Sequence, residues 1–484
     1  MYQQLISYGE SDVYPFHMPG HKRRALPFPN PYTIDITEID GFDNLHHAEG
    51  LIREAEERAA ELYGADRSYY LVNGSTCGLL AAICAAARRG DKVLAARNCH
   101  KAVYHAVSMQ GLAVEFLYPA ITRGDLQGQI TAAQVEEALT KHPDIAVVIL
   151  TSPTYEGIVS DVAAIAACCH AHGAALIVDE AHGAHFGFGA GFPENAVRLG
   201  ADAVIMSLHK TLPSFTQTAL LHCNGTRIDP GRVARYLGVY ETSSPSYLFM
   251  AGMDACIDLI REQGAELFAE YRRRLDAFYR DTADLAQLHV MRREDLCKEE
   301  AYDWDDSKLI IYAGTMGGEA LHQELLGHYH LQMEMVSADY VLGMTSLMDT
   351  DEGMQRLVTA LHEIDEKNRR MAEPHETAEE NRKTELDGEV PEAGFTARMY
   401  RKNPRRMQIY QALDLPYREV PLDEAVGKMA ADYVYLYPPG IPLIVPGEVI
   451  TEEFIRHIRE CRERKLNVEG QGNLAPGRIK IVYF

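Results

Sequence analysis

The chain of 484 residues lacks several patterns that would assign it to a class at once. It has no stretch of 18 apolar residues without a charge, so no membrane span is expected. Its first residues show no basic segment followed by an apolar run, so no signal peptide is predicted. Its nine cysteines include no C-x-x-C pair, and their odd number argues against a disulfide framework or a zinc ribbon. These absences favour a cytoplasmic protein.

Positive charge is also scarce. There are 47 Lys and Arg residues against 70 Asp and Glu residues, which gives a formal net charge of −23. A nucleic-acid binder would normally present a basic face, so that class is not expected. The acidity has two interpretations: it keeps the protein soluble, or it steers a cationic substrate inward. The length is sufficient for two or three domains.

Nucleotide and metal motifs are missing as well. No P-loop occurs, and the GFGAG segment at 187–191 lacks the G-x-G-x-x-G spacing, so we interpret it as a flexible loop. His17, His21, His46 and His47 lack helical spacing with nearby carboxylates, so no metal site is expected.

What is present is a regular alternation of strands and helices. Residues 51–63 favour a helix that Gly64 ends. Strands are predicted at 68–72, 92–96, 113–117, 145–150, 175–179 and 203–207, and helices at 78–88, 101–110, 132–140 and 161–172. Short β-branched runs separated by helices predict an α/β fold with a mostly parallel sheet, whose ligands bind at the carboxyl ends of the strands.

The remaining segments suggest a division of the chain. Residues 1–45, rich in Pro, His, Gly and Asp, are expected to form an irregular N-terminal arm, and 46–285 the large domain. A charged helical pattern at 254–282 leads out of it. Residues 286–371 suggest a small α/β domain, 372–395 an acidic linker, and 396–484 a C-terminal domain.

Two of the predicted strands end in chemically reactive residues. Asp179 closes the strand at 175–179, and Lys210 follows the strand at 203–207. Pyridoxal phosphate uses such a pair: a lysine amine forms an imine with its aldehyde, and a carboxylate keeps its pyridine nitrogen protonated. Each residue alone could equally be a surface lysine or a helix-capping aspartate.

Phosphate and ring contacts have candidates too. Ser75 and Thr76 follow the first strand and open a helix with Gly74, a place where backbone N–H groups bind phosphate, although ordinary helix capping uses the same residues. Ser207 and His209 could add phosphate contacts. His100 could stack on the pyridine ring or cap a helix.

These residues occur within segments that resemble the Orn/Lys/Arg decarboxylase family, which are fold-type-I pyridoxal-phosphate enzymes with the aspartate-aminotransferase architecture. The resemblance is closest to short bacterial forms without the N-terminal wing domain. The segments that carry it are FHMPGHK (16–22), DITE (35–38), DNLH (43–46), NGST (73–76), RNCHK (97–101), PTY (153–155), VDEAHG (178–183), SLHKT (207–211), SSPSY (243–247) and YPPGIP (437–442).

The resemblance implies roles for individual residues. Lys210 is expected to hold the cofactor, Asp179 to pair with its ring nitrogen, and His100 to stack on the ring. Ser75, Thr76, Ser207 and His209 are expected to bind the phosphate, and His182 to lie beside the phenolic oxygen. Ser243 is expected to reach the phosphate of a neighbouring subunit, which implies at least a homodimer.

The implied reaction is decarboxylation of arginine, lysine or ornithine to an amine, toward polyamines. Lys210 and His209 are both candidates for returning a proton to Cα. Candidates for binding the cationic tail are Glu38, Asp40, Asp43 and Glu448, each of which could equally be a solvated loop acid. An aminotransferase, an acyl-CoA-condensing synthase and a non-catalytic regulatory subunit remain alternatives.

Overall fold

The computed structural model describes residues 1–24, 26, 28–371, 394–396, 400–436, 440–464, 466–470 and 477–483. Nearly all of the acidic linker expected at 372–395 lies outside these residues, as do positions 437–439 of the YPPGIP segment.

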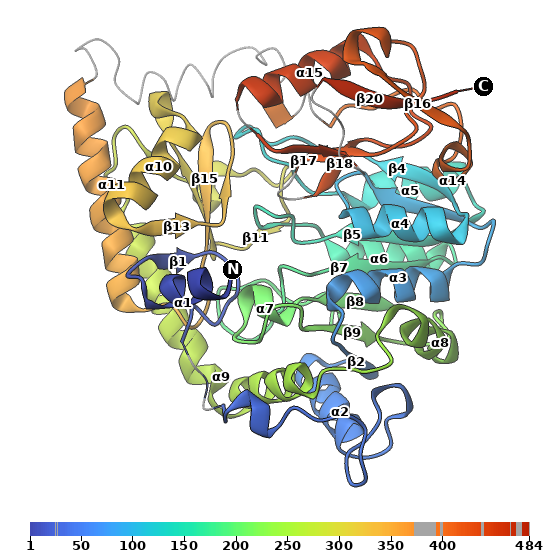
Figure 1. Cartoon of the computed structure of the whole chain (residues 1–484), viewed down its shortest axis with the longest axis horizontal. Coiled ribbons are helices and arrows are strands. Elements are labelled where there is room, and N and C mark those ends of the chain that lie inside the picture. The colour runs from blue at the N-terminus through green and yellow to red at the C-terminus, as the bar shows by residue number, and fades with distance from the viewer. Residues whose placement is uncertain are drawn as a thin grey trace.

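A seven-stranded sheet forms the centre of the molecule (Figure 1), in the order β2-β9-β8-β7-β5-β3-β4. Its strands are β2 (Arg67–Leu71), β3 (Lys92–Ala96), β4 (Ala113–Leu117), β5 (Ile145–Thr151), β7 (Ala175–Asp179), β8 (Ala203–Met206) and β9 (Ala219–Cys223). Strand β9 is antiparallel to both of its neighbours, β2 and β8, and the other neighbouring pairs in this sheet are parallel. The mostly parallel sheet expected from the sequence is confirmed.

Helices cover both faces of this sheet. The helices of this part of the chain are α2 (Leu51–Tyr63), α3 (Gly74–Ala86), α4 (Lys101–Gln110), α5 (Ala132–Lys141), α6 (Val162–Ala171), α7 (Leu208–Thr211), α8 (Pro230–Tyr240) and α9 (Tyr247–Asp281). Helices α3, α4 and α8 pack together on one face, and α5 and α6 lie on the other (Figure 1). The two-sided cover explains why all five residues of β7 are buried.

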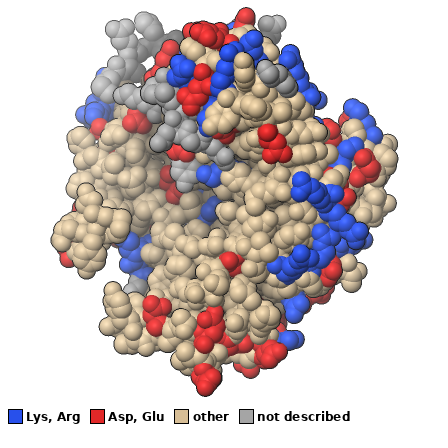
Figure 2. Space-filling model, turned by 45° about the vertical axis from the view of Figure 1, so that its right-hand side comes forward, with Lys and Arg blue, Asp and Glu red and all other residues tan. Residues whose placement is uncertain are grey.

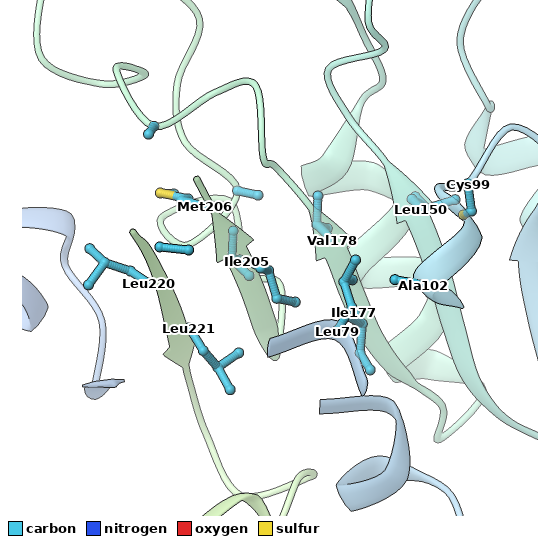
Figure 3. Packing of buried hydrophobic residues seen from close by; sticks show 14 of the residues in the cluster. Leu79, Cys99, Ala102, Leu150, Ile177, Val178, Ile205, Met206, Leu220 and Leu221 are labelled. Atoms are coloured by element: carbon cyan, nitrogen blue, oxygen red, sulfur yellow. The ribbon is translucent and has the colours of Figure 1, made fainter. Parts of the chain in front are cut away.

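The core packs between this sheet and its helices. Figure 3 shows Leu79 of α3 beside Ile177 of β7, with Ile205 of β8 and Leu221 of β9 further along the same layer. All four side chains are at most 1% exposed. This close packing fixes the strand ends that carry the candidate site.

Some elements match the sequence prediction and others do not. Helix α2 has the predicted bounds because Gly64 adopts the left-handed conformation, at φ +81°, that ends it. Strand β9 and helix α8 were not predicted. Helix α9 begins at Tyr247 rather than near 254, since Ser246 caps it and the apolar face continues through Met250 and Met253.

The N-terminal stretch is more regular than expected. It contains helix α1 (Tyr2–Glu10) and strand β1 (Tyr14–Phe16), so the expectation of an irregular arm is wrong for these residues. Strand β1 pairs in parallel with β13 (Leu331–Met333). A partner more than 300 positions away along the chain leaves no local signal, because strand pairing is a tertiary contact.

A second, antiparallel sheet follows α9, in the order β10-β12-β15-β14. Its strands are β10 (His289–Val290), β12 (Lys308–Tyr312), β14 (Met335–Val336) and β15 (Tyr340–Met344), flanked by α10 (Gly318–Tyr329) and α11 (Asp351–Met371). Strand β11 (Asp303–Trp304) pairs with β6 (Ile158–Val159) in a separate two-stranded sheet, which links this region to the segment between β5 and α6.

The C-terminal region has a small core of its own. It contains β16 (Tyr417–Pro421), β17 (Val434–Leu436), β18 (Ile441–Ile444), β19 (Val468–Gly470) and β20 (Arg478–Val482), with helices α14 (Ile409–Leu413) and α15 (Glu452–Glu463). The division into domains stays a prediction. Within the described part of the chain, no helix is both long and apolar enough to cross a membrane.

The FHMPGHK segment ties the N-terminal stretch to the loop that carries Lys210. The Gly20 N–H donates to the carbonyl oxygen of His209 at 2.7 Å, and the Ser346 hydroxyl donates to the Gly20 carbonyl at 2.6 Å. Lys22 is buried, and its Nζ donates to the carbonyl oxygen of Met344 at 2.6 Å. The segment therefore supports α7 from outside the large sheet.

We predict that Gly20→Ala destabilises the protein by about 1–3 kcal/mol, because overpacking a close contact costs that much. A Cβ at Gly20 would lie 2.7 Å from the carbonyl oxygen of Leu212, a backbone atom that cannot swing away. The midpoint of urea unfolding measures the effect.

Gly9→Ala is the matched control, since a Cβ there meets nothing within 4 Å. Gly9 lies inside α1, where Ala is favoured over Gly by about 0.5–1 kcal/mol, so no loss of stability is expected. Equal unfolding midpoints for Gly20→Ala and the wild type would contradict the close contact.

Candidate active site at the carboxyl edge of the sheet

A cavity of about 490 Å³ lies at the carboxyl ends of the central strands. Its wall contains eight of the nine residues singled out from the sequence, namely Ser75, Thr76, His100, Asp179, His182, Ser207, His209 and Lys210. Parallel strands bring these residues together from four separate segments of the chain. The structure therefore assembles the set, and the role of each residue stays a prediction.

Asp179 and Lys210 come from adjacent strands. Asp179 is the last residue of β7, and Lys210 lies in α7 directly after β8, which pairs in parallel with β7. Burial raises the pKa of the Asp179 carboxyl, and the nearby Lys210 charge opposes that rise. Burial lowers the pKa of Lys210, and Asp179 opposes it in turn. Each group thus reduces the cost of burying the other.

His182 contacts the lysine directly. Its Nε2 lies 2.9 Å from Lys210 Nζ, and its ring packs on Tyr155 with the ring centres 4.6 Å apart. Burial lowers the pKa of His182 well below its ordinary value, so the imidazole is neutral. Nε2 then accepts a hydrogen bond from Lys210, and Nδ1 carries the ring proton.

His100 and His209 are also neutral. His100 caps α4 by accepting from the Ala102 N–H, and burial lowers its pKa to about 3. His209 Nδ1–H donates to the carbonyl oxygen of Thr218 at 3.0 Å, and burial lowers its pKa to about 4. The sequence left two roles open for His100, helix capping and stacking on the ring. His100 caps α4 and also lines the cavity, and its stacking on the ring stays a prediction.

The start of α3 provides polar groups of the kind that bind phosphate. Ser75 Oγ lies 2.6 Å from Ser207 Oγ, which joins the first turn of α3 to the segment after β8. Gly74 has φ +75°, a conformation that favours glycine, where the chain enters the helix. The free N–H groups of this first turn and the two hydroxyls can hold an anion.

Among the residues predicted to bind the cofactor, Ser243 alone does not line the cavity. It is exposed and lies between α8 and α9. It does not contribute to the cavity of its own chain, so its predicted contact with a neighbouring subunit stays a prediction.

The acids expected near the entrance do not line the cavity. The Asp43 carboxylate accepts from the N–H groups of Gly50 and Ile52 and so caps the start of α2. Glu448 is buried, with Oε2 3.5 Å from Arg97 Nη2. Both carboxylates stabilise the fold where they lie, and Glu38 and Asp40 are on other parts of the arm.

Two other carboxyl groups do line the cavity, and sequence reasoning missed both. Glu334, between β13 and β14, accepts from the Tyr155 hydroxyl at 2.6 Å and from the Met18 N–H at 2.8 Å. Glu156 is 8% exposed, accepts from the Tyr340 hydroxyl at 3.3 Å, and burial raises its pKa. A second cavity of about 620 Å³ shares both residues, so they lie where the two spaces adjoin.

The surplus of negative charge is not uniform over the surface. On the face in Figure 2, Lys and Arg side chains gather in a band along the right-hand side, and Asp and Glu side chains gather at the bottom. The net charge alone therefore does not indicate where a cation would bind.

The cavity has the groups that pyridoxal phosphate requires. Buried polar atoms without a hydrogen-bond partner in the described residues include Asn98 Oδ1, Gln127 Oε1 and His182 Nδ1, and all three residues line the cavity. Such atoms are costly unless a ligand or water meets them. The start of α3 would hold the phosphate, Lys210 the aldehyde carbon and Asp179 the ring nitrogen.

Comparison with known proteins agrees with this geometry. The sequence model described as Orn/Lys/Arg decarboxylase, major domain, matches residues 1–295, and that of the C-terminal domain of the same family matches residues 395–470. An arginine decarboxylase of Halalkalibacterium halodurans is 31% identical over 97% of this chain and 94% of its own length. An arginine decarboxylase of Bacillus subtilis is 30% identical over 100% and 97%.

Solved structures extend the comparison to the fold. The lysine decarboxylase of Francisella novicida superposes with a TM-score of 0.76 at 19% identity, covering 99% of this chain and 80% of that one. An alanine–glyoxylate aminotransferase from Nostoc superposes with a TM-score of 0.52 at 16% identity, covering 65% and 86%. The fold is thus the fold-type-I architecture of pyridoxal-phosphate enzymes. The chain belongs to the Orn/Lys/Arg decarboxylase family and is an amino-acid decarboxylase that uses pyridoxal phosphate.

Proposed function

We propose that the chain decarboxylates a basic L-amino acid, with arginine preferred over lysine and ornithine, and that the amine product leads toward polyamines. The observation that carries the proposal is one cavity that holds both the Lys210–Asp179 pair and the carboxyl groups of Glu156 and Glu334. The first pair suits the cofactor, and the second suits a cationic side chain.

Pyridoxal phosphate supplies an aldehyde that takes up amines and a ring that accepts the electron pair left when carbon dioxide departs. Asp179 is suited to pair with the ring nitrogen because it is buried and its neighbour is a cation. Burial lowers the pKa of Lys210, which increases the share of neutral, nucleophilic amine. The bond to His182 Nε2 directs that amine into the cavity.

Lys210 is also the better candidate for returning a proton to Cα. A histidine with a pKa of about 4 carries no extra proton at neutral pH, and His209 Nδ1–H is already bonded to Thr218. Lys210 Nζ keeps exchangeable protons, and it lines the same cavity. Of the two proton donors that the sequence left open, Lys210 is therefore favoured over His209.

The cationic tail has a binding site in Glu156 and Glu334. A guanidinium has five N–H donors in a fixed fork, so it can form two parallel hydrogen bonds to a carboxylate. An ammonium acts as a point charge without this fixed geometry. Two carboxyl groups that line both cavities offer such a fork separate acceptors. The names of the two relatives reported above add support for arginine.

An aminotransferase is less well supported. Enzymes of that class usually bind the substrate carboxylate with an arginine, and among the described residues no arginine lines the cavity. We further propose that the active enzyme is a homodimer, in which Ser243, exposed on its own chain, contacts the cofactor phosphate of the partner.

Lys210→Ala is expected to abolish carbon dioxide release and the visible absorbance of covalently held cofactor, because no other lysine lines the described part of the cavity. Radiometric or manometric carbon dioxide assays and an absorbance spectrum measure the two effects. Lys92→Ala is the control, since Lys92 pairs with Asp144 at the other end of β3 and should leave both properties unchanged. Full turnover by Lys210→Ala would refute the assignment.

Glu334→Gln and Glu156→Gln are each expected to lower kcat/KM for arginine about 10- to 100-fold, since a hydrogen bond to a charged group is worth about 1.5–3 kcal/mol. Carbon dioxide release from arginine, lysine and ornithine, with the amine identified, measures substrate choice as well as rate.

Asp40→Asn, on the exposed arm, is the matched control for loss of one acidic residue. It should change none of the three rates beyond the error of the assay. The tail assignment fails if both Glu variants decarboxylate arginine as the wild type does, even where arginine is confirmed as the substrate.

A further inference from the structure

Three side chains of types that can bind metals converge on helices α5 and α6, away from the cavity. Glu136 lies on α5, and Cys168 and His172 lie at the end of α6, which packs beside α5 (Figure 1). The Glu136 carboxylate lies 3.0 Å from His172 Nε2 and 3.2 Å from Cys168 Sγ. One ligand atom from each residue lies within 4.8 Å of the other two.

The residues next to Cys168 in the chain do not take part in the cluster. Cys169, the next residue, is completely buried, and His170 is bonded to Asp202 at 2.9 Å, so neither turns toward Glu136. Cys168 and His172 share a face of α6 because they are four residues apart. The expectation of no metal site concerned the N-terminal histidines and their lack of helical spacing with nearby carboxylates, and it did not consider this cluster.

We propose that Glu136, Cys168 and His172 form a binding site for Zn²⁺. A thiolate, an imidazole and a carboxylate are the ligand types of Zn²⁺, whereas Mg²⁺ and Ca²⁺ take oxygen ligands. Water would complete a four-coordinate shell, because His172 and Glu136 are exposed to solvent. On binding, the Cys168 S–H bond breaks, its proton passes to solvent, and the sulfur bonds the metal.

The distances suit a tetrahedral ion with little rearrangement. Zn–S and Zn–N bonds of the usual length place neighbouring ligand atoms about 3.5 Å apart. The two contacts to Glu136 are 3.0 and 3.2 Å long, so the side chains need only small rotations to admit the ion. The ion would join α5 to α6, and α6 leads directly into β7, the strand that ends at Asp179.

The test uses the holoenzyme after treatment with a chelator. Titration with Zn²⁺ against a chromophoric competitor should show one tight equivalent per chain, and Co²⁺ should give the visible bands of a tetrahedral ion with a thiolate ligand. Cys168→Ser and His172→Gln should each raise the Zn²⁺ Kd on the order of 100-fold, since loss of even an outer partner of a ligand costs 10- to 100-fold.

Cys297→Ser is the matched control, because Cys168 and Cys297 are the two cysteines that are not buried. It should bind Zn²⁺ as the wild type does, and all variants should keep the visible absorbance of the cofactor, which reports folding. The proposal is overturned if the wild type binds no Zn²⁺ at micromolar concentration. It is equally overturned if Cys168→Ser and His172→Gln bind as tightly as Cys297→Ser does.

Discussion

The pairing of β7 with β8 is the contact on which the candidate site depends. Because the two strands are neighbours and run in parallel, Asp179 and the loop that carries Lys210 emerge at the same edge of the sheet. A carboxyl group or an ammonium buried alone would be costly, and each reduces that cost for the other. The packed layer beneath them, including Ile177 and Ile205, keeps the two strand ends in register.

The large sheet and the core of the site could be predicted from the sequence because their signals are local. Strand β7 is a run of apolar residues that ends in Asp179, and α2 ends where Gly64 provides a left-handed turn. The rule that ligands bind at the carboxyl ends of parallel strands then selects Asp179, Lys210 and the start of α3 without knowledge of distances. Eight of nine predicted residues meet for this reason.

The residues that sequence reasoning missed depend on contacts between distant segments. Glu334 directly follows β13 and lines the cavity, and the pairing of β13 with β1 brings the Met18 N–H close to its carboxylate. Asp43 and Glu448 were reasonable candidates by composition, but neither lines the cavity: Asp43 caps the start of α2, and Glu448 is buried beside Arg97. Composition reports that an acid is present, whereas only the folded structure shows which acids line the cavity.

The electrostatics of the cavity explain why a cationic substrate suits it. Burial keeps His100, His182 and His209 uncharged, so the charge of Lys210 acts on Asp179 without competition from neighbouring imidazolium groups. The start of α3 and the serine hydroxyls can hold a phosphate through N–H and O–H donors and the dipole of the helix. Lys210 is the only Lys or Arg in the described lining of the cavity, whereas Asp179, Glu156 and Glu334 all line it, and this excess of acidic residues favours a substrate with a positively charged side chain.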